Sequence, residues 1–158
     1  MSDTVLIVSE DASVRLSIEA VLRSRGLPVR SAADGSEAYE LLRSHDGVFA
    51  VLVVDFDAGV SGMNGWELLR RVRGRFEGPP LAVPPRVVVV SSIAEPATER
   101  FVRRLGAHDF LLKPVGSAEM TEAVVALIKG CRARHGPRVD AVFGRNTTVT
   151  KRIGSALW

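Results

Sequence analysis

Phe49-Ala50-Val51-Leu52-Val53-Val54-Asp55 is the stretch that decides the fold of this chain, because a run of six apolar residues ends in a carboxylate. A short, continuous, valine-rich run is typical of a strand buried on both faces of a parallel sheet. In open α/β sheets, ligands bind beyond the carboxyl ends of such strands. Asp55 is therefore predicted to lie at the rim of the core, in a candidate site.

Three other apolar runs also end in polar groups. They are residues 5–8 before Ser9-Glu10-Asp11, residues 87–90 before Ser91-Ser92, and residues 110–112 before Lys113-Pro114. Because parallel strands end at the same edge of a sheet, carboxylates, a hydroxyl and a lysine are expected to gather there. Such a group of side chains suits a metal ion and a phosphoryl group.

Stretches with helical periodicity separate the apolar runs. Ser36, Asn64 and Ser117 are predicted N-caps of the second, third and fifth helices, and Pro96 opens the fourth. We predict strands at residues 5–8, 29–31, 49–54, 86–90 and 108–112, and helices at 12–25, 36–44, 65–73, 95–105 and 117–129. This alternation predicts an α/β fold with a doubly wound, five-stranded parallel sheet and helices on both faces.

The bulk composition is that of a soluble globular protein. The chain has 158 residues, of which 46% are apolar and 25% charged, and this size suits one domain with an appendage. Cys131 is the single cysteine, so no internal disulfide can form. The N-terminus has no basic signal-peptide region, and no apolar stretch approaches the ~20 residues that span a bilayer. A cytoplasmic protein without membrane insertion is expected.

Charge divides the chain into two parts. Residues 1–130 carry 15 Lys and Arg against 17 Asp and Glu, a net charge of −2. Residues 131–158 carry 6 basic residues and one acid, Asp140, a net charge of +5. We predict a domain over residues 1–130 and a basic C-terminal extension over 131–158, disordered or loosely docked. A contact of this basic tail with nucleic acid is the alternative.

Five pieces of sequence follow one another in a distinctive order. They are Val5-Leu6-Ile7-Val8 before acids, Ala33-Asp34-Gly35-Ser36-Glu37-Ala38, Val53-Val54-Asp55, Val90-Ser91, and Gly106-Ala107-His108-Asp109-Phe110-Leu111-Leu112-Lys113-Pro114. Together they resemble the receiver domain of two-component response regulators, over roughly residues 4–130. The resemblance implies the flavodoxin-like strand order 2-1-3-4-5.

The resemblance also implies a role for several polar strand ends. Asp55 would be the phosphoacceptor, a nucleophile that becomes an acyl phosphate. Lys113 would pair with the phosphoryl oxygens and Ser91 would hydrogen-bond another of them. Phe110 matches the family's aromatic switch position, which turns inward when the hydroxyl moves. Pro114 follows Lys113 at a peptide bond that is often cis in the family.

Mg²⁺ is the cofactor that the resemblance implies. Its expected ligands are Glu10, Asp55 and the backbone carbonyl of Asp57. Asp11 is an alternative ligand, provided that the turn after the first strand holds one extra residue. Mg²⁺ commonly uses one or two carboxylates together with waters and phosphoryl oxygens.

Three departures from the family pattern bear on this site. Ser9 stands at the first of two positions that are usually acidic, which removes one charge near the ion. The loop after Asp55 carries Ala58-Gly59 where Met-Pro is usual, with about two residues added before Asn64. Phe110 lacks the hydroxyl that a tyrosine would donate. The first two departures bear on Mg²⁺ affinity.

The leading hypothesis is therefore a response regulator receiver of a phosphorelay, a switch that binds partners rather than an enzyme that turns over substrate. Its implied partners are a sensor histidine kinase or phosphotransfer protein and an output protein. The surface formed by the fourth helix, fifth strand and fifth helix would carry the signal or form a homodimer. The alternative is a pseudo-receiver, an interaction module without useful Mg²⁺ binding or phosphorylation.

Two other classes of protein, a phosphatase and a flavodoxin, are alternatives to these hypotheses. Asp55-Phe56-Asp57 is similar to the first motif of haloacid-dehalogenase-type phosphatases, but the later acidic pair of that family is missing after Lys113. A flavodoxin would need hydroxyls and glycines around a flavin phosphate, and Ser9-Glu10-Asp11 would repel that phosphate. The receiver hypothesis fits the sequence better than both.

Overall fold

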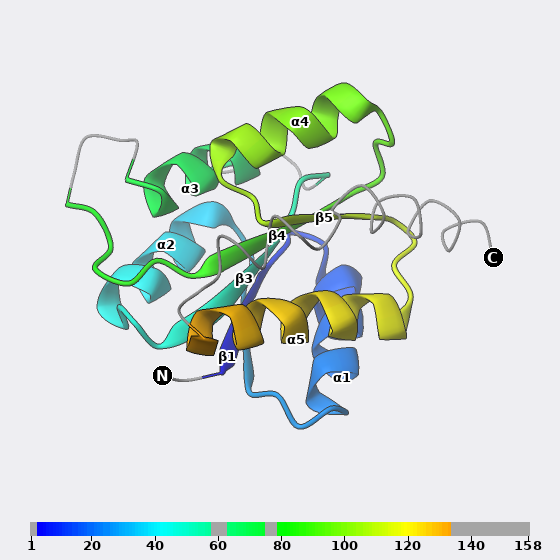
Figure 1. The fold of residues 1–158 in the computed structure, drawn as a ribbon, viewed down its shortest axis with the longest axis horizontal. Coiled ribbons are helices and arrows are strands. Elements are labelled where there is room, and N and C mark those ends of the chain that lie inside the picture. The colour runs from blue at the N-terminus through cyan, green and yellow to red at the C-terminus, as the bar shows by residue number, and fades with distance from the viewer. Residues whose placement is uncertain (1–2, 58–62, 75–78, 134–158) are drawn as a thin grey trace.

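The computed structural model describes residues 3–57, 63–74 and 79–133, in which strands and helices alternate (Figure 1). The strands are β1 (Thr4–Val8), β2 (Val29–Ala32), β3 (Phe49–Asp55), β4 (Arg86–Ser91) and β5 (Asp109–Leu112). The helices are α1 (Ala12–Arg23), α2 (Gly35–Ser44), α3 (Gly65–Val72), α4 (Pro96–Leu105) and α5 (Ser117–Ala133). The predicted order of elements is confirmed.

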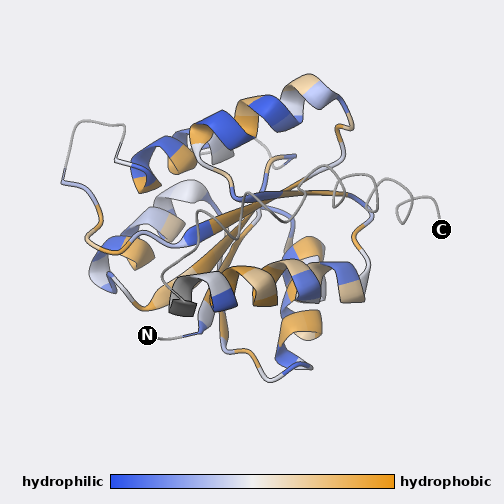
Figure 2. Ribbon diagram, viewed as in Figure 1, coloured by the Kyte–Doolittle hydropathy of each residue, from blue (hydrophilic) through white to orange (hydrophobic). Residues whose placement is uncertain are grey.

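The strands form one parallel sheet in the order β2-β1-β3-β4-β5. Alternate side chains of β3 enter two separate cores, with Leu52 and Val54 in one and Val51 and Val53 in the other. Helices α2, α3 and α4 cover one face, and α1 and α5 cover the other (Figure 1). Figure 2 shows the central strands as the most hydrophobic part of the fold. The predicted doubly wound sheet and its strand order are therefore confirmed.

Side chains in the connecting loops fix where three helices begin. Asp11 caps α1 by accepting from the backbone N–H groups of Ser13 and Val14. Asn64 caps α3, as predicted. The predicted cap of α2 is wrong, because Asp34 rather than Ser36 caps this helix.

The reason for the earlier start of α2 lies in a contact between loops. The backbone N–H of Gly35 donates to the Met63 carbonyl oxygen at 3.2 Å, which fixes the first residue of the helix. Asp34 then accepts from the N–H of Glu37, three residues further on. Ser36 contacts the same loop through its Oγ, which accepts from the N–H of Met63 at 3.3 Å.

The ends of the last two elements also differ from prediction. β5 begins at Asp109 rather than His108, whose Nδ1 accepts from the N–H of Val87 at 2.9 Å. Helix α5 begins at Ser117 itself, so this residue is not its cap, and continues through Gly130 to Ala133. Gly130 is buried, and packing of this helix face outweighs the weak helix propensity of glycine. The rest of the predicted basic extension, 134–158, lies outside the described residues, as do residues 58–62 of the altered loop.

Candidate functional site

The register of the sheet brings four strand ends together. Val8 of β1 pairs with Val54 of β3, which places Ser9 beside Asp55. Ser91 of β4 pairs with Leu112 of β5, and the N–H of Lys113 donates to the Ser91 carbonyl at 2.9 Å. Polar side chains from these strand ends therefore lie close together at one edge of the sheet, as predicted.

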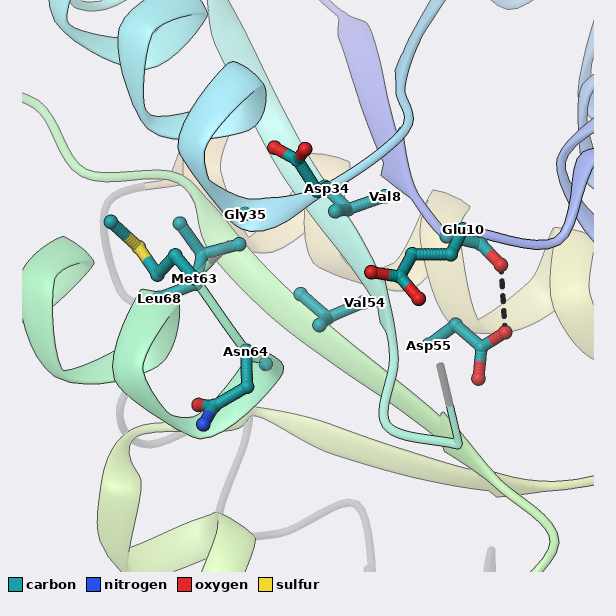
Figure 3. A pocket seen from close by; sticks show the side chains of 11 residues that line it. Val8, Glu10, Asp34, Gly35, Val54, Asp55, Met63, Asn64 and Leu68 are labelled. Atoms are coloured by element: carbon teal, nitrogen blue, oxygen red, sulfur yellow. Dashed lines mark hydrogen bonds between the residues drawn. The ribbon is translucent and has the colours of Figure 1, made fainter. Parts of the chain in front are cut away.

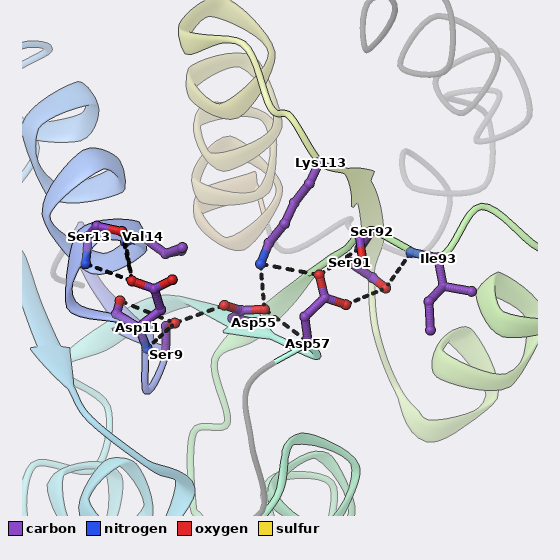
Figure 4. A network of polar contacts seen from close by, with 10 residues as sticks. All are labelled: Ser9, Asp11, Ser13, Val14, Asp55, Asp57, Ser91, Ser92, Ile93 and Lys113. Atoms are coloured by element: carbon purple, nitrogen blue, oxygen red, sulfur yellow. Dashed lines mark hydrogen bonds and ion pairs between the residues drawn. The ribbon is translucent and has the colours of Figure 1, made fainter.

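Asp55 is the centre of the polar network in Figure 4, and only 6% of the residue is exposed. Its Oδ1 accepts from the Lys113 ammonium at 3.0 Å and from the backbone N–H of Asp57 at 2.9 Å. Its Oδ2 accepts from the hydroxyl of Ser9 at 2.8 Å. Three donors therefore hold a nearly buried carboxylate in one orientation, as a buried charge requires.

Asp57 uses its side chain in a way that the sequence did not predict. Its Oδ2 lies 3.2 Å from the Lys113 ammonium and accepts from the N–H of Ser92 at 2.8 Å. Its Oδ1 accepts from the hydroxyl of Ser91 at 3.2 Å. Burial by itself would raise the pKa of Asp57, but hydrogen bonds from Ser92 and Lys113 outweigh it, so the pKa lies below its usual value. The sequence did contain one signal for this role, since Asp57 follows Asp55 by only two residues at the end of β3.

Lys113 bridges the two carboxylates. Partial burial would lower its pKa, but Asp55 and Asp57 outweigh this effect and the pKa is raised above its usual value. The ammonium is therefore a fixed positive charge at neutral pH. The peptide bond between Lys113 and Pro114 is cis, as the resemblance implied.

The two acids that follow Ser9 have different surroundings. The Oδ1 of Asp11 accepts from the N–H and hydroxyl of Ser13 and from the N–H of Val14. These bonds, led by that of the Ser13 hydroxyl, lower the pKa of Asp11. Glu10 instead lines a pocket together with Asp34 and Asp55 (Figure 3). Of the two candidate ligands after β1, Glu10 is the one that shares a pocket with Asp55.

The donor set of this pocket is compatible with Mg²⁺. Glu10 and Asp55 supply hard carboxylate oxygens, and Mg²⁺ is commonly held by one or two carboxylates while it keeps several waters. Within residues 3–57, 63–74 and 79–133, no group of three or more His, Cys, Asp or Glu side chains could hold a metal ion. Waters and a backbone carbonyl would therefore have to complete the coordination.

Two further residues complete the surroundings of the site. Phe110, at the predicted switch position, is 2% exposed and belongs to the core beneath α2, α3 and α4. Ser9 is 1% exposed, and its carbonyl accepts from the Arg15 guanidinium at 2.6 Å. The sequence does not predict the direct hydrogen bond from Ser9 to Asp55, because a serine at this position indicates only the loss of an acid.

Comparison with known proteins decides the family. The model of the response regulator receiver domain matches residues 5–125. This chain belongs to that family. Members of this family are phosphoacceptor signalling domains of two-component systems and not classical enzymes.

Similar sequences come from distant organisms. The receiver is 34% identical to the Regulator of RpoS of Escherichia coli (strain K12) over 111 residues, which are 70% of this chain and 30% of that protein. It is 32% identical to the two-component response regulator ORR5 of Oryza sativa over 117 residues, 74% of this chain and 82% of that one. It is 23% identical to response regulator GtcR of Aneurinibacillus migulanus over 94% of this chain and 57% of GtcR. The chain thus spans about half or less of the length of GtcR and of the Regulator of RpoS.

Solved structures agree on the fold. A response regulator receiver protein from Pseudomonas putida matches with a TM-score of 0.64 and 27% identity, covering 79% of this chain and 96% of that one. The receiver domain of the Francisella response regulator 1452 matches with a TM-score of 0.69 and 23% identity, covering 80% and 96%. In the described part of the receiver, none of the helices has the length and apolar character needed to cross a membrane.

Proposed function

We propose that this receiver is a phosphorylatable switch that accepts a phosphoryl group on Asp55. The observation that carries the proposal is the pairing of the Asp55 Oδ1 with the Lys113 ammonium at 3.0 Å, at the carboxyl end of a central strand. Both groups sit at the edge of the sheet where ligands of open α/β folds bind. The carboxylate is oriented, and a cation stands beside it.

The proposed step is an in-line displacement at phosphorus. A carboxylate oxygen of Asp55 attacks the phosphorus of the donor, the bond from phosphorus to the donor's leaving atom breaks, and the leaving group keeps that electron pair. An acyl phosphate forms on Asp55. Lys113, the Ser91 hydroxyl and the Ser92 N–H then neutralise or hydrogen-bond the phosphoryl oxygens, because phosphoryl transfer depends mainly on position and charge.

Mg²⁺ would be held by Glu10, Asp55 and the backbone carbonyl of Asp57. When bound, it would neutralise charge on the phosphoryl oxygens in transfer. The support for this assignment is the pocket that Glu10 and Asp55 share. Asp11 is the weaker candidate ligand, since its Oδ1 accepts three hydrogen bonds at the start of α1.

On phosphorylation, the surface formed by α4, β5 and α5 would rearrange and change its binding of partners, with Phe110 as the switch residue. Phe101 of α4, a large apolar residue, is 50% exposed and would be available to a partner on this surface. A sensor histidine kinase or phosphotransfer protein would supply the phosphoryl group in the cytoplasm. An output protein or a second copy of the chain would bind this surface, and contact of the basic tail with nucleic acid is a lesser proposal.

Mass spectrometry of the intact protein tests the phosphoacceptor. The wild type, Asp55→Asn and Glu40→Gln would each be incubated with Mg²⁺ and acetyl phosphate. Glu40 is an exposed carboxylate on α2, so its variant controls for the loss of one negative charge. We expect one added phosphoryl group on the wild type and Glu40→Gln, and none on Asp55→Asn. Equal labelling of Asp55→Asn would refute the assignment.

A pseudo-receiver is the second candidate function. Two observations favour it. Ser9 stands where an acid is usual, and the Asp57 carboxylate already forms an ion pair with Lys113. This candidate predicts no labelling of the wild type even at high Mg²⁺ concentration. The same mass measurement therefore separates the two functions.

A further inference from the structure

The carboxylate of Asp57 binds three donors that the proposed function assigns to the phosphoryl group. These donors are the Lys113 ammonium at 3.2 Å, the Ser92 N–H at 2.8 Å and the Ser91 hydroxyl at 3.2 Å. We call the three donors the anion cradle. Lys113 directly follows β5, Ser91 ends β4 and Ser92 follows it, and all three point at one carboxylate (Figure 4).

We propose that the Asp57 side chain is an internal anion that competes with the phosphoryl group of Asp55 for this cradle. Asp57 would thus be a regulatory residue that slows phosphorylation, and its displacement would accompany acceptance of the phosphoryl group. The inference rests on the proposed function of Asp55 and goes beyond it, because the resemblance assigned only the backbone carbonyl of Asp57 a role.

The geometry favours competition between the Asp57 carboxylate and a phosphoryl group for the anion cradle. One ammonium serves both carboxylates, at 3.0 Å from Asp55 and 3.2 Å from Asp57. A phosphoryl group on Asp55 adds negative charge near the Asp57 carboxylate, because both carboxylates contact the same ammonium, and like charges close together repel. The hydroxyl of Ser91 donates its single hydrogen to Asp57 and cannot donate it to a phosphoryl oxygen as well.

Asp57 is placed so that it can leave the cradle. Its side chain is 23% exposed, whereas the side chain of Asp55 is 3% exposed. Rotation of the Asp57 side chain would therefore move its carboxylate into water, at no cost of burying a charge elsewhere. The side chain of Asp55 cannot reach water in this way. This difference is consistent with Asp55 as a fixed acceptor and Asp57 as an anion that can be displaced.

The test compares the rate of phosphorylation of Asp57→Ala and Asp57→Asn with that of the wild type, using acetyl phosphate and Mg²⁺. Both variants keep the backbone carbonyl, so the proposed metal ligand is unchanged. Asp57→Asn also keeps an acceptor for the Ser92 N–H, which guards against local unfolding. We expect both to be labelled faster, on the order of tenfold for Asp57→Ala, because a charge-assisted contact no longer has to be broken. Glu40→Gln should keep the wild-type rate.

A second readout does not require labelling of Asp55. Inorganic phosphate would be titrated into each protein while the Ser92 amide signal is followed by NMR. We expect Asp57→Ala to bind phosphate several-fold more tightly than the wild type, because its cradle is free.

The outcomes separate the two claims. Equal labelling rates in the wild type and both Asp57 variants would overturn the competition and leave the phosphoacceptor in place. Absence of labelling in every protein would overturn the phosphoacceptor instead. In that case the phosphate titration tests only whether Asp57 competes with a free phosphate for the anion cradle: tighter binding to Asp57→Ala supports this competition, and unchanged affinity overturns it.

Discussion

Ser9 is the residue that most changes the chemistry of this receiver site. Its hydroxyl donates to the Asp55 Oδ2 at 2.8 Å, and the residue is 1% exposed. A neutral donor therefore stabilises the acceptor carboxylate where the family usually has a second acid. The serine thus supplies a hydrogen bond to Asp55 but no negative charge that would attract a metal ion.

We expect Ser9→Asp to make stability depend on Mg²⁺. In a chelator the melting temperature should fall below that of the wild type, because two carboxylates would meet in a nearly dry site. Added Mg²⁺ should restore it, since an ion present at 100 times its Kd stabilises by about 2.7 kcal/mol. Thermal unfolding with and without Mg²⁺ measures this, with Ser9→Asn as the uncharged control. A Ser9→Asp variant whose melting temperature does not change with Mg²⁺ would contradict the assignment of the metal site to the edge of the sheet that holds Asp55.

Asp57 should make stability depend on pH in the acid range. Its pKa is lowered in the fold, so its contribution is present above the unfolded value of about 3.9 and is lost as pH falls through the folded pKa. The wild type should thus melt at a higher temperature than Asp57→Asn at pH 7, and the difference should be smaller at pH 3. Circular dichroism melts at both pH values provide the comparison. A gap that persists undiminished at pH 3 would count against the ion pair with Lys113.

At the scale of elements, the start of α2 is fixed by a close approach between loops. A Cβ on Gly35 would meet the backbone carbonyl of Met63 and lie 3.0 Å from the Met63 Cβ. The same glycine lines the pocket that Glu10 and Asp55 share. The packing of this part of the pocket therefore depends on the absence of a side chain at Gly35.

Gly35→Ala should destabilise the receiver by about 1–3 kcal/mol, the usual cost of inserting a methyl group into a packed contact. Urea unfolding would give the value. Ser44→Ala, an exposed change at the other end of α2, is the control and should stay within about 0.5 kcal/mol of the wild type. A Gly35→Ala variant as stable as this control would show that the two loops separate freely.

The elements also show what could be read from the sequence. The strands were predictable because apolar runs buried on both faces, such as residues 49–54, carry their own signal. The start of α2 was not, because Asp34 and Ser36 are both good caps and a contact with Met63 selects between them. The contacts of the Asp57 side chain were not predicted either, because they join the end of β3 to Lys113 after β5, although an acid two residues after Asp55 was an available signal.

At the scale of the whole molecule, the described core is self-contained. All residues of its two buried clusters lie between Val5 and Ile128, on the two faces of one sheet. The proposed boundary near residue 130 falls just after the last of them. The domain boundary itself stays a prediction, and only α5, which runs to Ala133, extends past it within the described residues.

A chain that ends after Ala133 is expected to fold. Because the apolar clusters would be intact, its melting temperature should lie within about 4 °C of that of the full chain, which corresponds to less than about 1 kcal/mol. Circular dichroism would follow the transition of both proteins. Loss of the cooperative transition in the shortened chain would show that residues 134–158 belong to the folding unit.

The central claim is that Asp55 accepts a phosphoryl group, and chemical trapping of that residue tests it most directly. After incubation with acetyl phosphate and Mg²⁺, borohydride reduction converts an aspartyl phosphate to homoserine, and peptide mass spectrometry locates the converted residue. We predict homoserine at position 55 and at no other aspartate. An unmodified Asp55, or conversion at a different residue such as Asp57, would contradict the account.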